Sequence, residues 1–338
     1  MWYKDTGKHL NESEVRKFIN NVLKPDAYSW LKEVGSNVMK QGVKDADEAL
    51  KRFFKKQVAF PKLKKKHKAK PSFYVNYESL KRTQTGFKGE KIGYVKTSEP
   101  LPKLPQGAKY KNPRITFDGK YWYLSVGHEI DVIDSTLTPE SVGVDVGIKN
   151  LATISNIDKP ISNINKSVVV RKTKRKLKRK QRQVSKKYEM NKQGKMFIKT
   201  KNMLKLENEI RIIYKRLNDI RQNHLHQATN MIVKTKPSRI VVENLNIKGM
   251  MKNRYLSKAI AEQKLHEFTR QLEYKSQMHG IEFVKANRWF PSSKTCFSCG
   301  VVKKKLSLKE RVFKCDSCDF ALDRDKNASF NLANYYAI

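Results

Sequence analysis

All four cysteines of the chain stand within 23 positions, in two C-x2-C pairs separated by fifteen residues. Each pair can turn two thiolates toward one metal ion, and four thiolates complete the shell of a structural zinc site with no open position for catalysis. Disulfides or unrelated buried thiols are the alternatives, but disulfides are rare in a cytosolic chain. The spacing therefore predicts a zinc ribbon over residues 291–320. Its expected ligands are Cys296, Cys299, Cys315 and Cys318.

The charge of the chain restricts its partners. Lysine and arginine number 72 against 32 aspartates and glutamates, so the net charge is 72 − 32 = +40. A polyanion neutralises such an excess, which makes nucleic acid the expected partner. The sequence has no apolar run long enough to cross a bilayer and no signal-peptide core at its N-terminus. We therefore expect a cytoplasmic, nucleoid-associated protein with no membrane partner.

The densest positive charge falls on the first of two long helices predicted over residues 166–234. Arg171–Lys187 carries eleven lysines or arginines in seventeen positions. A solvated face is one interpretation, but like charges at i,i+4 destabilise a free helix, and a phosphate backbone would relieve them. The second helix carries a seam from Leu206 to Met231 in steps of four and three, which predicts an antiparallel hairpin with the first helix. The residues expected to bind nucleic acid are Lys172, Lys174, Arg175, Lys176, Lys178, Arg179, Lys180 and Arg182.

The front of the chain changes from helical to strand-like patterns. Residues 1–57 are predicted to be helical, with Asn11 and Glu14 as a capping box and a second helix over residues 45–56. Residues 72–133 contain short aromatic and β-branched segments, including a hairpin around Asp118-Gly119, and predict a small barrel or curved sheet.

Three aromatic side chains follow that turn, and two interpretations of them remain open. Lysine-rich and aromatic barrel faces often bind nucleic acid. The alternative is that Tyr121, Trp122 and Tyr123 alternate between the core and the surface, as residues of a strand do.

Three acids occupy positions where apolar residues or caps are expected. Asp145 lies in the strand VGVDVGI, flanked on its own face by two glycines that leave room for a metal ion and a phosphate. Glu243 ends the strand RIVVE, at the edge where α/β sheets place their sites. Asp325 lies near the start of a final helix. Each has a plainer interpretation: a turn acid, a loop acid, and a helix N-cap for which Asp323 competes. Together they fit two-metal phosphodiester hydrolysis with Mg²⁺ or Mn²⁺.

Four segments together resemble one protein family: GVDVGIKNLATIS, IVVENLNIKGMMKNR, RWFPSSKTCFSCG and RVFKCDSCDFALDRDKNASFNL. They are similar to the TnpB proteins (OrfB of the IS200/IS605 transposons), relatives of the type V CRISPR effectors. The resemblance implies a multidomain α/β plus β-barrel fold: an RNase H-like RuvC domain with a basic helical hairpin and a zinc-ribbon insertion, preceded by a wedge-type β-barrel with a helical insertion.

The resemblance also implies a division of the chain. Its expected parts are a helical recognition-like region over 1–57, a wedge-like barrel over 58–137, a RuvC domain over 138–290 with its hairpin at 166–234, the zinc ribbon over 291–320, and the last RuvC motif over 321–338. Beside the family the chain begins late, and the first barrel strand is expected to be missing.

The function implied is a transposon-encoded, RNA-guided DNA endonuclease. Its Mg²⁺- or Mn²⁺-dependent site would be formed by Asp145, Glu243 and Asp325, and the four cysteines would hold structural Zn²⁺. Expected partners are a guide RNA from the transposon end, target DNA, and a transposase encoded by the same element. Two alternatives remain: an RNA-guided DNA-binding protein or repressor that does not cut, and a non-catalytic zinc-ribbon protein that binds nucleic acid.

Overall fold

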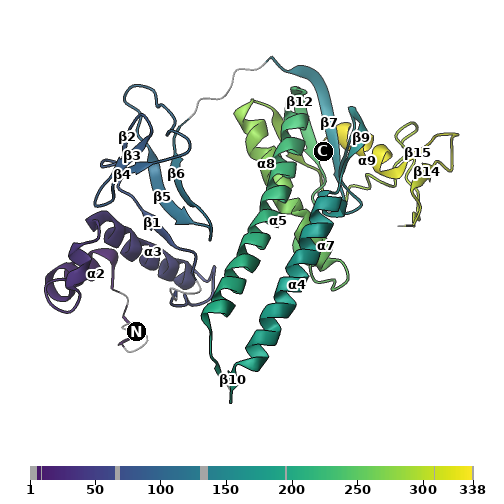
Figure 1. The fold of residues 1–338 in the computed structure, drawn as a ribbon. Helices are drawn as coiled ribbons and strands as arrows, with labels where there is room; N and C mark the ends of the chain where they lie inside the picture. Colours follow the sequence, from purple (N-terminus) through teal and green to yellow (C-terminus); the bar gives the residue numbers. More distant parts are fainter. Residues whose placement is uncertain are drawn as a thin grey trace. The chain divides into compact units, whose positions relative to one another are not determined.

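The computed structural model describes residues 6–8, 10–64, 69–129, 136–194, 196–307 and 309–336. The chain forms two compact units, Met1–Ile130 and Asp131–Ile338 (Figure 1). The predicted boundary at 137/138 follows residues 130–135, which lie outside the described residues, so the finer division of the chain stays a prediction. Within the described ranges, no helix combines the length and the apolar character that a membrane span requires.

The first unit begins with helices. They are α2 (Glu12–Phe18), the π-helical turn η1 (Ile19–Leu23), the 3-10 turn η2 (Ser29–Lys32) and α3 (Ser36–Phe54). The predicted capping box is confirmed: the Asn11 side chain accepts a hydrogen bond from the Glu14 amide, and the Glu14 carboxylate accepts one from the Asn11 amide at 2.8 Å. The predicted start of the second helix at residue 45 is wrong. Helix α3 begins nine residues earlier, and its earlier turns bury Val43.

The strands of the first unit form two three-stranded antiparallel sheets. One has the order β1 (Ser72–Tyr74), β5 (Lys111–Phe117), β6 (Trp122–Gly127); the other has the order β2 (Lys81–Arg82), β3 (Gly86–Gly89), β4 (Gly93–Lys96). Their shared core contains Val75, Phe87 and Ile115. The predicted hairpin is confirmed, because Phe117 pairs with Trp122 across the turn. Closure into a wedge-type barrel stays a prediction.

The aromatic run that follows this turn does not alternate between core and surface. Tyr121, Trp122 and Tyr123 are 52%, 58% and 44% exposed. Strand β6 is an edge strand, and it packs Leu124 and Val126 against the core instead. None of the three is buried, so the prediction of a core position among them is wrong. Trp122, on the same face of β6 as Leu124 and Val126, still contacts Phe73 and Phe117, with ring centroids 6.5 and 4.9 Å apart.

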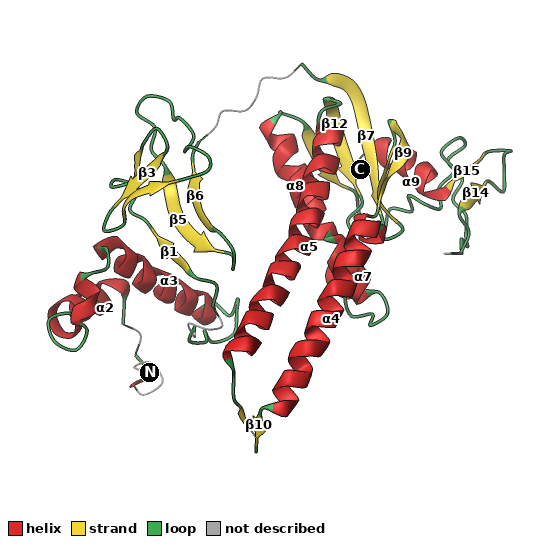
Figure 2. Ribbon diagram, viewed as in Figure 1, coloured by secondary structure: helices red, strands yellow, loops and turns green. Residues whose placement is uncertain are grey.

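The second unit is built on a five-stranded mixed sheet (Figure 2). Its strands are β7 (Thr138–Val146), β8 (Asn150–Ile154), β9 (Ile157–Ser162), β12 (Pro237–Val242) and β13 (Glu282–Lys285). In the order β13-β12-β7-β8-β9, β7 pairs in parallel with β12, and β12 with β13, whereas β8 and β9 are antiparallel. Asp145 therefore stands on the central strand, and Glu243 directly follows its parallel neighbour β12.

Helices join these strands. They are η3 (Ile164–Lys166), α4 (Val168–Met190), α5 (Lys201–Val233), α6 (Ile247–Met250), α7 (Ser257–Gln263), α8 (Leu265–Met278) and α9 (Arg324–Ala333). Two short ribbons complete the unit: β10 (Lys192–Gln193) with β11 (Met196–Phe197) at the tip of the α4–α5 hairpin, and β14 (Val312–Lys314) with β15 (Ala321–Asp323) before α9.

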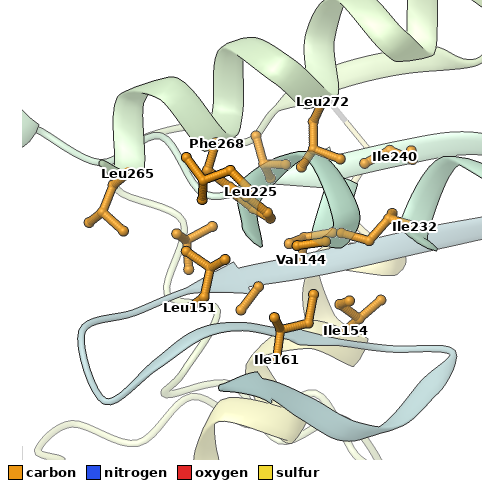
Figure 3. Packing of buried hydrophobic residues seen from close by; sticks show 14 of the residues in the cluster. Val144, Leu151, Ile154, Ile161, Leu225, Ile232, Ile240, Leu265, Phe268 and Leu272 are labelled. Carbon is orange, nitrogen blue, oxygen red and sulfur yellow. The ribbon is translucent and has the colours of Figure 1, made fainter. Parts of the chain in front are cut away.

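Helices α5 and α8 cover one face of the sheet (Figure 3). Leu225, Ile232, Phe268 and Leu272 join the core formed by strand residues such as Val144. The apolar seam predicted for α5 is correct near α4, where Ile213 and Leu217 pack with Leu177. It is wrong farther along, because Met231 is 42% exposed. Beyond Ile220 the helix packs on the sheet, so the buried positions move to Leu225, Ala228 and Ile232.

Helix α9 packs against β7 on the side where Val241 and Leu332 form a second apolar cluster. The approach is close: a Cβ on Gly143 would lie 1.9 Å from the carbonyl oxygen of Ser329. From the sequence, we interpreted the missing side chain at Gly143 as room for a metal ion and a phosphate. That interpretation is wrong for Gly143. Helix α9 occupies the space, and it can pack this close to β7 because Gly143 has no side chain.

We predict that Gly143→Ala destabilises the second unit by about 2 kcal/mol or more, because the new methyl group overlaps backbone atoms that cannot move aside. Hydrogen exchange of the β7 and α9 amides during a urea titration measures the loss. Gly42→Ala is the control, since Gly42 lies on an exposed part of α3 with open space around it, and alanine there favours the helix by about 0.5–1 kcal/mol. Unchanged protection of α9 in Gly143→Ala would contradict the packing argument.

Candidate active site and metal centre

The three predicted acids line one cavity of about 440 Å³. Asp145 reaches it from the end of β7, and Glu243 from the residue after β12. Asp325 reaches it from the first turn of α9. All three are half-buried, so each carboxylate is partly withdrawn from water and still accessible through the cavity.

The electrostatics of the cavity oppose negative charge on Asp145. Burial raises the pKa of Asp145 well above its usual range, and the carboxylates of Glu243 and Asp325 raise it further, against the opposing charge of Arg324. Burial also raises the pKa of Glu243. A cation held between the acids would favour their ionised forms, so the cavity suits a positively charged ligand.

Asp323, and not Asp325, caps helix α9. The Asp323 carboxylate accepts hydrogen bonds from the amides of Asp325 and Lys326 at 3.0 and 3.1 Å. The plainer interpretation of Asp325 as the N-cap is therefore wrong. Its carboxylate is left to face the cavity, where Arg324 lies 3.4 Å from it.

The donor set of the cavity fits hard divalent cations, because Mg²⁺ and Mn²⁺ prefer carboxylate oxygens. The acids do not form a tight cage, however. Among the described residues, the four cysteines are the only group of three or more candidate ligands whose atoms all lie within 4.8 Å of one another. A wider spacing of carboxylates is compatible with two ions about 4 Å apart.

Sequence reasoning missed four cations that line the same cavity as the acids: Lys149, Lys294, Arg311 and Arg324. Arg324 lies between two acids in the sequence, and its side chain is only 13% exposed. Arg311 belongs to the loop between the cysteine pairs, residues 300–314, which is rich in lysine and arginine. Its convergence with the acids depends on the tertiary fold, which no local pattern reveals.

The four cysteines meet as the spacing predicts. Cys296 and Cys318 place their Sγ atoms 3.8 Å apart, and Cys299 and Cys315 place theirs 3.5 Å apart. Four thiolates around one zinc ion at about 2.3 Å would lie about 3.8 Å from one another, so the cluster fits a tetrahedral Zn²⁺ site. Cys296 is buried and Cys299 is exposed, which places the cluster at the surface of the unit.

The basic residues of α4 divide into two groups. Six of the eight predicted to contact nucleic acid line an open groove of about 780 Å³ together with Arg216 of α5: Lys172, Arg175, Lys176, Lys178, Arg179 and Arg182. The other two form ion pairs inside the unit, Lys174 with Glu262 at 2.6 Å and Lys180 with Glu209 at 2.7 Å. The charge available to a ligand is therefore concentrated in the first group.

Comparison with known proteins connects these features. Residues 126–254 match the family OrfB_IS605, described as "Probable transposase", and residues 266–332 match the "Cas12f1-like, TNB domain". A protein of Streptomyces pristinaespiralis named "Putative RNA-guided DNA endonuclease" is 30% identical over 315 residues, which are 91% of this chain and 73% of the relative. The chain belongs to the OrfB (TnpB) family. The family member of Escherichia coli K12 named "Putative RNA-guided DNA endonuclease InsQ" is 26% identical over 90% of this chain and 75% of its own.

A solved structure shares the fold of this OrfB chain. The protein in a structure titled "Cryo-EM structure of the Cas12f1-sgRNA-target DNA complex" aligns with 98% of this chain and 77% of its own, with a TM-score of 0.55 and 17% identity. The mixed architecture of sheets and helices expected from the sequence is confirmed at this level.

We predict that Asp145→Asn stabilises the metal-free OrfB chain at pH 7. Because folding raises the pKa of Asp145, the folded state holds its proton more tightly, and wild-type stability falls as pH rises above the usual aspartate range. Asparagine cannot ionise and avoids that loss. Thermal unfolding in EDTA between pH 4 and pH 8 measures both proteins. The difference should shrink toward pH 4, and a variant less stable than wild type at pH 7 would contradict the argument.

Proposed function

We propose that this protein is an RNA-guided DNA endonuclease encoded by a transposon, with a RuvC-type site formed by Asp145, Glu243 and Asp325. The observation that carries the proposal is the convergence of these three acids, from three separate parts of the chain, on one cavity in the second unit. The sheet supports it: three antiparallel strands followed by two parallel ones, in the order β9-β8-β7-β12-β13, fit the RNase H-like arrangement. The RNA guide and the DNA substrate in the proposal are taken from the names of the relatives.

In this proposal the three carboxylates hold divalent cations, Mg²⁺ or Mn²⁺, which supply the Lewis acidity for phosphodiester hydrolysis. The raised pKa of Asp145 means that ionisation and cation binding are coupled, so cation affinity should increase with pH. Arg311, Arg324 and Lys294 can contact the phosphates that flank the bond to be cut. The four cysteines hold Zn²⁺ as a structural ion.

The basic groove of α4 supports the nucleic-acid part of the proposal. Its lysines and arginines track a phosphate backbone and release counterions when it binds. A guide RNA paired with target DNA is the ligand that the relatives' names indicate. A transposase partner from the same element stays a prediction from the resemblance alone. A non-catalytic zinc-ribbon protein would explain the groove and the cysteines but not the converging acids.

We predict that Asp145→Ala lowers Mg²⁺-dependent DNA cleavage by at least about 10³-fold, because cation stabilisation of the transition state is worth several kcal/mol. The assay uses the protein with its co-purified RNA and a DNA target that matches that RNA. Binding of RNA and DNA should stay within about twofold of wild type. Glu140→Ala is the control, since Glu140 is an exposed acid on the same strand, β7, outside the cavity. Wild-type cleavage by Asp145→Ala would rule out the assigned site.

We predict that Arg175→Gln combined with Arg179→Gln weakens nucleic-acid binding and reduces the slope of log K against log salt by about 1.4–1.8, or about 0.7–0.9 per lost phosphate contact. Lys174→Gln combined with Lys180→Gln removes the same charge from the same helix, but both residues are ion-paired within the unit. That pair should change the slope much less. Equal slopes for the two double variants would show that the groove does not hold the backbone.

A further inference from the structure

Two buried asparagines on α9 bind the segment that carries the first zinc ligand. Asn327 is 0% exposed; its side-chain oxygen accepts a hydrogen bond from the Phe297 amide at 3.1 Å, and its nitrogen donates one to the Thr295 carbonyl at 2.8 Å. Asn331, one turn later and 7% exposed, donates to the carbonyls of Ser292 and Thr295 at 2.8 and 2.7 Å. The helix is thus bonded to the chain on both sides of Cys296.

These bonds permit a single placement of α9 on the zinc knuckle, which we define as residues 292–301. A buried amide group without partners is costly, so Asn327 is satisfied only where both of its bonds form. The knuckle has its own turn, in which the Cys296 amide donates to the Val301 carbonyl and the Gly300 amide donates to the Cys296 carbonyl. Phe297 also packs on Phe330 of α9, with ring centroids 4.8 Å apart.

The first turn of the same helix carries Asp325. Lys326, the next residue, donates from its ammonium group to the carbonyls of Ile154, Ser155 and Ile157 at 2.8–3.0 Å, which fixes the start of α9 on the β8–β9 turn. The position of Asp325 is therefore set from two sides, by the sheet through Lys326 and by the zinc knuckle through the asparagines.

We infer that Asn327 and Asn331 are positioning residues that transmit the geometry of the zinc knuckle to Asp325, so that zinc on the cysteines strengthens binding of the divalent cation at the acids. The inference rests on the proposed function, because it takes Asp325 as a ligand of that cation. By linkage, cation bound at the acids strengthens zinc binding by the same factor. The zinc site is then part of the device that orients the active site, in addition to stabilising the ribbon.

The test measures Mn²⁺ binding to the full chain by electron paramagnetic resonance. Binding that remains in Asp145→Asn is subtracted, because it reports Mn²⁺ bound away from the acids. Asn327→Ala, with zinc retained, should weaken Mn²⁺ binding about tenfold, the lower end of the effect of losing a group that orients a metal ligand. Asn331→Ala leaves the hydrogen bonds of Asn327 in place and should weaken Mn²⁺ binding by a smaller factor. This milder variant carries the test if Asn327→Ala does not fold. Asn334→Ala, an exposed asparagine at the end of the same helix, should match wild type.

Removing zinc separates positioning from general destabilisation. Zinc-stripped wild type should lose about as much Mn²⁺ affinity as zinc-loaded Asn327→Ala, and stripping zinc from Asn327→Ala should cause little further loss, because both changes break the same connection. Additive losses, or wild-type Mn²⁺ affinity in both asparagine variants with zinc retained, would overturn the inference. A wild-type chain that binds Mn²⁺ at Asp145 but does not cleave DNA would instead overturn the proposed function and leave this inference standing.

Discussion

The contact between α9 and β7 is the constraint on which the candidate site depends. The helix can lie this close only because Gly143 presents no side chain to the Ser329 carbonyl. Asp145 stands two residues farther along the same strand, and Asp325 stands one turn before Ser329 on the same helix. A shift of the helix away from the strand would therefore separate the two carboxylates directly. The contact between Gly143 and Ser329 therefore also sets the distance between Asp145 and Asp325, which would bind the cation.

The overall charge of the chain is strongly positive, whereas its candidate site is a cluster of acids. Its net charge of +40 favours polyanions, yet three acids gather in a partly desolvated cavity. Burial raises the pKa of Asp145, and the carboxylates of Glu243 and Asp325 raise it further, so a cation held among them would favour the ionised forms. Four basic side chains line the same cavity, and a separate basic groove lies on α4. The positive charge is thus divided between the acidic cavity, where Arg324 lies 3.4 Å from Asp325, and a groove on α4 whose charged lining is entirely basic.

Local sequence patterns correctly predicted features that depend on residues close together in the sequence. They failed where a helix or strand packs against an element far away in the chain. The cysteine spacing, the Asn11 capping box and the strand around Asp145 follow from short-range geometry, and the structure confirms them. The seam of α5 was predicted correctly only beside α4, because a single sequence does not show that the helix leaves one partner for another at Ile220. The role of Gly143 was misread for the same reason, since Ser329 of α9 lies 186 residues farther along the chain. The pair Asn327 and Asn331, two amides one turn apart on α9, was a visible signal of the contact with the zinc knuckle that sequence reasoning did not use.

The order of the three acids along the chain has a consequence for synthesis in the cell. Asp145 and Asp325 are 180 residues apart, and Glu243 lies between them. At about 5–20 residues per second, a ribosome needs roughly 10–40 s to pass from the first acid to the third. The basic hairpin of α4 and α5 is complete at Val233, about halfway through that interval, whereas the set of carboxylates stays incomplete until Asp325. In the proposed function, the basic surface for nucleic acid is therefore synthesised before the set of acids assigned to DNA hydrolysis is complete.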